Sequence, residues 1–143
     1  MLYSTHIIFA LFIEGRTSVL NLGLAALGGL FPDLDSATGK LSKIAKNRGE
    51  NLKHRGILHT PFLAIAIFVI YYLLFRNLLI LPFIIGMFSH IFLDFLTGRG
   101  VMILYPISRK RFHIIGIKTG SLLEKMLFIV FFLGFLLRFF QII

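Results

Sequence analysis

The residues with the clearest chemical potential are a histidine and an aspartate, His90 and Asp94, in the apolar stretch 86–97. Side chains four residues apart on a helix point the same way, and Thr97 extends this line by one more turn. An ionisable pair that faced hydrocarbon would be energetically costly, so it must face an interior, a cavity or a partner. Neutral imidazole and carboxylate are ordinary ligands for zinc and related divalent metals. The spacing is therefore typical of part of a metal site or of a buried hydrogen-bonded pair.

The chain is expected to position these residues with five helices in an all-α fold. Apolar segments separated by polar turns predict helices over residues 6–13, 19–31, 61–75, 78–96 and 121–143. The second of these is rich in Gly and Ala, which let neighbouring helices approach closely. The polar and basic residues between the second and third helices are expected to form a loop or a short interfacial helix.

The composition places this bundle in a membrane. The chain has 143 residues, of which 57% are hydrophobic, a mean hydropathy of +0.90 and a net charge of +9. A water-soluble domain would carry more than 15% charged residues, so we expect one membrane-embedded domain over residues 1–143, a polytopic helical bundle whose first two helices are short. The absence of cysteine excludes disulfides and thiolate metal ligands. The positive charge could indicate a nucleic-acid partner, but basic loops that face anionic lipid explain it equally well. For a membrane-embedded domain, membrane lipid is the expected partner.

The connections bring eight candidate metal ligands to one end of the bundle, because short connections make neighbouring helices antiparallel. They are His6, Asp33, Asp35, His54, His59, His90, Asp94 and Glu124. Scattered structural residues would not segregate in this way, so the convergence favours a metal site with histidine and carboxylate ligands. The same end carries most of the Lys and Arg residues, and the positive-inside rule then places it on the cytoplasmic side.

Several of these residues also have structural interpretations that the sequence leaves open. Asp33 and Asp35 could form a turn at the end of their helix, and Glu124 could complement the positive N-terminal end of its helix. Thr97 could donate to the backbone one turn back. Arg55 is either a membrane-facing cation or a clamp on a phosphoryl oxygen, which its forked guanidinium suits.

The order of these motifs resembles the YdjM-type family of inner-membrane-associated, metal-dependent hydrolases over almost the whole chain. The matching features are His6, Pro-Asp-x-Asp at 32–35, His-Arg-Gly-x-x-His at 54–59, His-x-x-x-Asp-x-x-Thr-x-x-Gly at 90–100, and then Pro106, a basic stretch and Glu124. The chain departs from the family at 58–60, where Leu-His-Thr replaces the frequent Thr-His-Ser. The family is in turn distantly similar to zinc-dependent phospholipase C and the P1-type nucleases, helical enzymes with a cluster of zinc ions.

The resemblance and the ligand set together predict a hydrolase for a phosphoester or phosphodiester, either a lipid or a small molecule. The eight ligands would hold two or three divalent ions, zinc or else manganese, at the cytoplasmic face of the inner membrane. Asp94 and Thr97 are the expected catalytic residues, together with Arg55, which would neutralise developing charge. Two rival interpretations are a divalent-metal transporter and a non-catalytic membrane protein whose metal only holds short helices together.

Overall fold

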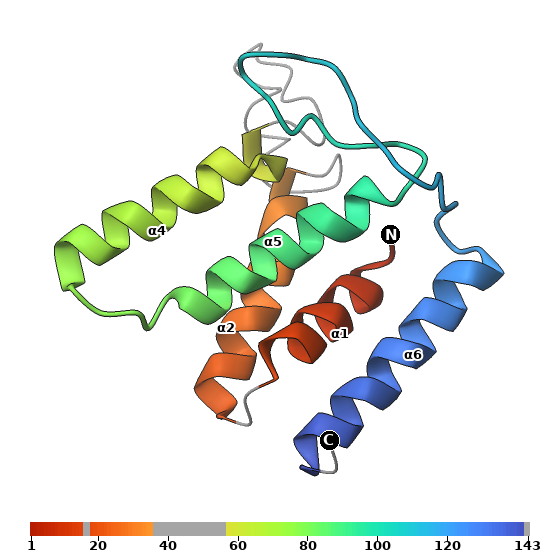
Figure 1. Ribbon diagram of the computed structural model, residues 1–143, viewed down its shortest axis with the longest axis horizontal. Coiled ribbons are helices and arrows are strands. Elements are labelled where there is room, and N and C mark those ends of the chain that lie inside the picture. The colour runs from red at the N-terminus through yellow and green to blue at the C-terminus, as the bar shows by residue number, and fades with distance from the viewer. Residues whose placement is uncertain (16–17, 36–56, 142–143) are drawn as a thin grey trace.

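The fold of the described residues is all-α and contains five α-helices (Figure 1). The computed structural model describes residues 1–15, 18–35 and 57–141. The α-helices are α1 (Tyr3–Glu14), α2 (Val19–Leu30), α4 (Pro61–Phe75), α5 (Leu81–Phe95) and α6 (Leu122–Phe139). Two short 3-10 helices, η1 (Phe31–Asp35) and η2 (Ile57–His59), follow α2 and precede α4. The polar segment for which we predicted a loop or an interfacial helix lies outside the described residues.

The helix boundaries follow local chemistry. Helix α4 spans the predicted residues, because the Thr60 hydroxyl caps it by accepting a hydrogen bond from the Leu63 N–H at 3.4 Å, and Pro61 fits its first turn. Helix α5 begins at Leu81, three residues later than predicted. The reason is Pro82, which has no N–H to donate and is tolerated in the first turn but not in a helix interior.

Helices α2 and α5 cross with their backbones in direct contact. A Cβ atom on Gly28 would overlap the carbonyl oxygen of Phe83, and one on Gly86 would overlap the carbonyl oxygen of Ala25. Small residues permit this approach, as the Gly- and Ala-rich composition of α2 predicts. Around this crossing, α1 packs against both helices, α4 packs against α5, and α6 packs against α1 (Figure 1).

The polar ends of the helices face one side of the molecule. The starts of α1 and α4 and the ends of η1 and α5 all lie toward the upper side of Figure 1. The segment that joins α5 to α6 returns over the end of α5, where Val101 and Phe112 exchange backbone hydrogen bonds of 2.9 and 3.0 Å. This arrangement agrees with the antiparallel topology predicted from the short connections.

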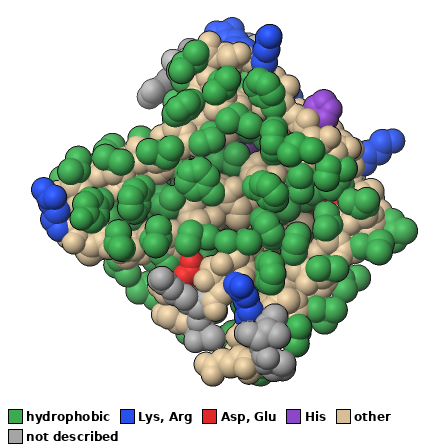
Figure 2. All heavy atoms as spheres, in the orientation of Figure 1, with side chains coloured by type: hydrophobic (Ala, Val, Ile, Leu, Met, Phe, Trp, Pro, Cys, Tyr) green, Lys and Arg blue, Asp and Glu red, His purple; other side chains and the backbone are tan. Residues whose placement is uncertain are grey.

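The predicted polytopic bundle requires helices that span a membrane. In the part of the chain that the structure describes, no helix combines the length and the apolar character needed to cross a membrane. The two helices expected to be longest, α5 and α6, have 15 and 18 residues. Figure 2 shows that hydrophobic side chains cover most of the visible face, and many on α4 and α6 are exposed, such as Leu74 and Leu122.

Candidate metal centre

Five of the eight predicted ligands meet in one cluster beneath the polar end of the helices. Helix α1 contributes the first, η1 and η2 contribute one each, and α5 contributes two, one turn apart. They are His6, Asp33, His59, His90 and Asp94. Asp33 has 13% of its side chain exposed and the other four have at most 1%, so the cluster is nearly closed to solvent except at Asp33.

The distances within the cluster suit ligands that share an ion. Asp94 Oδ1 is 3.6 Å from His6 Nε2, and Asp94 Oδ2 is 3.5 Å from His59 Nε2 and 3.8 Å from His90 Nε2. Asp33 Oδ1 is 3.7 Å from the same nitrogens of His59 and His90. Hydrogen bonds are shorter, about 2.7–3.2 Å. Donors bound to one tetrahedral zinc at about 2.0–2.1 Å are roughly 3.3–3.4 Å apart, so the observed spacing is close to that of a coordination shell.

The cluster contains two overlapping groups of three metal-binding side chains. One is His6, His90 and Asp94, and the other is Asp33, His59 and His90; within each group the ligand atoms all lie within 4.8 Å of one another. The two groups share His90, whose ring stacks on that of His6 at a centroid distance of 3.8 Å. The cluster therefore contains enough donor atoms to bind more than one ion.

The orientation of His90 is fixed by the backbone of α2. Its Nδ1 lies 2.6 Å from the carbonyl oxygen of Gly29, and a carbonyl only accepts, so Nδ1 carries the hydrogen and Nε2 presents its lone pair to the carboxylates. Burial lowers the pKa of His90 below its ordinary value, although Asp94 and Asp33 partly oppose this effect. Burial therefore favours the neutral imidazole, which is the form that binds a metal.

Two groups that touch the cluster were missed by reasoning from the sequence. The Gly29 carbonyl is one, and the Gly-rich composition of α2 next to Pro32 was the only signal that its backbone could approach α5. The other is the amino nitrogen of Met1, which donates a hydrogen bond to Asp94 Oδ1 at 3.2 Å. No sequence motif could have indicated this contact, because it depends on where the first turn of α1 lies relative to α5.

Thr97 supports the end of the ligand-bearing helix. Its buried hydroxyl donates to the backbone carbonyl of Asp94 at 2.7 Å, which is the structural alternative considered for it. Its predicted catalytic role stays a prediction.

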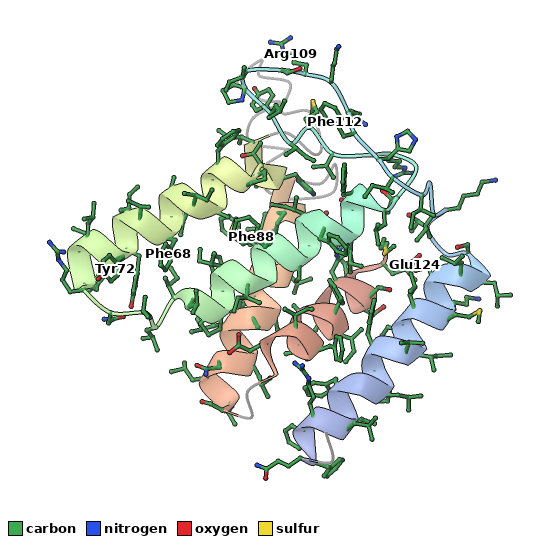
Figure 3. All side chains as sticks on the ribbon, in the orientation of Figure 1. Phe68, Tyr72, Phe88, Arg109, Phe112 and Glu124 are labelled. Carbon is green, nitrogen blue, oxygen red and sulfur yellow. The ribbon has the colours of Figure 1, made fainter. Side chains whose placement is uncertain are left out.

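Glu124 is buried but lies outside both groups of metal-binding side chains. Its Oε1 accepts hydrogen bonds from the Leu2 N–H at 2.5 Å and the Thr5 hydroxyl at 3.2 Å, and its Oε2 accepts one from the Gly120 N–H at 2.6 Å. Figure 3 shows it at the start of α6, beside α1. Glu124 is thus not brought together with the five clustered ligands, and its predicted role as a metal ligand is not supported by these contacts. Three other predicted site groups lie outside the described part of the structure: the Asp35 side chain, His54 and Arg55.

Comparison with known families identifies a family that covers the chain. The sequence model of a family described as YdjM inner membrane protein matches residues 1–142, which is nearly the whole chain. No curated protein and no solved structure matches the chain. The distant similarity to phospholipase C and the P1-type nucleases therefore stays a prediction.

Proposed function

We propose that this chain, which belongs to the YdjM inner membrane protein family, is a metal-dependent hydrolase that acts on phosphoesters. The observation that carries the proposal is the convergence of three imidazoles and two carboxylates, from four separate elements, at the spacing of metal ligands. Nitrogen and oxygen donors in this mixture suit zinc or manganese. Family membership supports the membrane location, and the donor set supports the metal.

Asp94 is suited to join two ions, because its two oxygens face different histidines. Oδ1 faces His6, whereas Oδ2 faces His59 and His90. His90 has only Nε2 available, since its Nδ1 is engaged by a backbone carbonyl, so it can serve one ion. In a loaded centre, Asp94 Oδ1 and His6 would hold one ion, here called the His6-side ion. Asp94 Oδ2, Asp33, His59 and His90 would hold the other, the His59-side ion.

When bound, two divalent ions supply an activated water and stabilise charge on the attacking and leaving oxygens of a phosphoester. The five ligand side chains would hold the ions, and their burial excludes bulk water from the centre. Asp33, as the most exposed of the five ligands, marks the side from which a substrate phosphate would approach. Arg55 and Thr97 stay the predicted catalytic residues beside Asp94, with the Arg55 guanidinium on phosphoryl oxygens.

The expected substrate is a phosphoester or phosphodiester at the inner surface of the membrane, with a lipid phosphate the most suitable class. The apolar surface of α4 and α6 supports contact with lipid. The segment between α5 and α6 contains five Lys and Arg residues and no acid, which by the positive-inside rule supports a cytoplasmic site. The predicted multi-pass arrangement stays part of this proposal.

A structural metal site is the second candidate function. The observation that favours it is that the five ligands come from four elements and are almost fully buried, so a metal would cross-link the fold. No comparable observation favours the divalent-metal transporter.

The deciding experiment measures metal content and phosphodiester hydrolysis together on purified, detergent-solubilised protein. We expect about two equivalents of zinc or manganese and turnover of bis-p-nitrophenyl phosphate or a phospholipid. Asp94→Ala should lose metal and turnover. His113→Ala is the matched control, because His113 is exposed and lies outside the cluster.

Each contrary outcome selects a different function. Bound metal without turnover of any phosphoester, together with loss of thermal stability on chelation, would replace the hydrolase with the structural site. Metal uptake into proteoliposomes would favour the transporter. Wild-type protein that binds no metal would overturn the proposal.

A further inference from the structure

Glu124 forms a buried link between the start of α6 and the first turn of α1. Its carboxylate is fully buried, and its two oxygens accept three hydrogen bonds, two of them from residues of the N-terminal segment. A buried carboxylate is costly unless donors satisfy it, and the Leu2 N–H, Thr5 hydroxyl and Gly120 N–H do so here. The link therefore fixes residues 2–5 against α6.

The residues on either side of the segment that Glu124 fixes both contact Asp94 Oδ1. Leu2 follows Met1, whose amino nitrogen contacts Asp94 Oδ1, and Thr5 precedes His6, whose Nε2 lies 3.6 Å from that oxygen. The two N-terminal groups that Glu124 binds are thus each one residue away from a group that contacts Asp94 Oδ1. Asp33, His59 and His90 belong to other elements, η1, η2 and α5, which do not contain the residues that Glu124 contacts.

We propose that Glu124 is a positioning residue for the His6-side ion and not a metal ligand. By holding the first turn of α1, it sets the position of His6 relative to Asp94 Oδ1, and it leaves the His59-side ion to the other elements. This inference rests on the proposed two-ion centre, and it assigns a role to a buried acid that the ligand cluster does not use.

The expected effect is selective. Residues that orient a metal ligand without touching the metal typically change metal affinity by about 10–100-fold when replaced. We expect Glu124→Ala to lower the affinity for the His6-side ion by this factor. The affinity for the His59-side ion should stay within about twofold of wild type. Glu124→Gln, which keeps one acceptor oxygen but places an amide against a backbone N–H, should have a smaller effect. Thr5→Val, which removes only the hydroxyl contact, should act in the same direction.

The experiment titrates Zn²⁺ into metal-free, full-length protein against a chromophoric chelator and fits two affinities. Lys125→Gln is the matched control, since Lys125 is the next residue of α6, is exposed, and makes none of these contacts. The melting temperature of each metal-free variant reports on the fold separately. A Glu124→Ala/His6→Ala double variant should bind like His6→Ala alone, because both changes act on one ion.

The positioning role would be overturned if Glu124→Gln and Thr5→Val lowered the affinities of both ions equally, or if they changed neither affinity. If a variant loses both ions and its metal-free form also melts at a lower temperature, Glu124 only stabilises the fold. Failure of the proposed function would be seen earlier and separately, as wild-type protein that binds no zinc.

Discussion

At the scale of single residues, the candidate centre depends on which atom of each side chain faces inward. Backbone hydrogen bonding directs His90 Nε2 into the cluster, and Asp94 presents one oxygen to each side of it. A single carboxylate with different neighbours at its two oxygens can bridge two ions, which a histidine with one available nitrogen cannot do.

This difference predicts distinct effects of two substitutions. Asp94→Asn keeps the size of the side chain but removes its charge, so we expect loss of both ions. His6→Ala removes a ligand of one ion, so about one equivalent should remain. Elemental analysis of both variants beside wild type checks this, and equal losses in the two variants would contradict the bridging role of Asp94.

At the scale of elements, the crossing of α2 and α5 sets the geometry of the cluster. The contact brings the Gly29 carbonyl to His90, four residues after Gly86 on α5. Any side chain at Gly86 would push the helices apart, because a Cβ there would overlap the carbonyl oxygen of Ala25.

We therefore expect Gly86→Ala to lower the free energy of unfolding by about 1–3 kcal/mol, the usual cost of overpacking, and to weaken metal binding through His90. Gly23→Ala is the control on α2, since nothing lies within 4 Å of a Cβ at that position. It should instead stabilise the protein by about 0.5–1 kcal/mol, because alanine favours a helix over glycine. Denaturant unfolding in detergent measures both, and a Gly86→Ala variant as stable as Gly23→Ala would exclude the close crossing.

At the scale of the whole molecule, charge and apolar surface are arranged in a way that predicts orientation. The segment between α5 and α6 carries exposed cations such as Arg109, which Figure 3 shows at the upper edge of the molecule. Among the described residues, the turn between α4 and α5 and the last turn of α6 carry Arg76 and Arg138. The predicted orientation therefore places the candidate metal centre toward the cytoplasm.

Single-cysteine labelling can test this orientation cleanly, because the chain has no cysteine of its own. We expect Ser108→Cys to react with a membrane-impermeant maleimide in inverted inner-membrane vesicles and not in right-side-out vesicles. Asn77→Cys, in the turn between α4 and α5, should show the reverse pattern if the multi-pass prediction holds. Labelling of Ser108→Cys from the periplasmic side would show that the predicted orientation is wrong.

The sequence by itself determined the all-α class, the extent of α4 and the gathering of polar residues at one end. These follow from local rules: Thr60 and Pro61 start a helix, and short connections force antiparallel neighbours. The start of α5 was placed too early, although the restriction that Pro82 imposes on a helix interior is also local.

Only the tertiary structure decided which acids and histidines meet. Ser121 caps α6 by accepting from the Glu124 N–H, a contact within one turn, yet the Glu124 carboxylate is used by Leu2 and Thr5 at the other end of the sequence. Asp33 and Glu124 are both acids near a helix end in the sequence, and only Asp33 reaches the histidines. Spacing along one helix determines the direction in which side chains point. The distance between residues on different helices depends instead on how closely the helix backbones pack. Here glycines at the α2–α5 crossing set that packing.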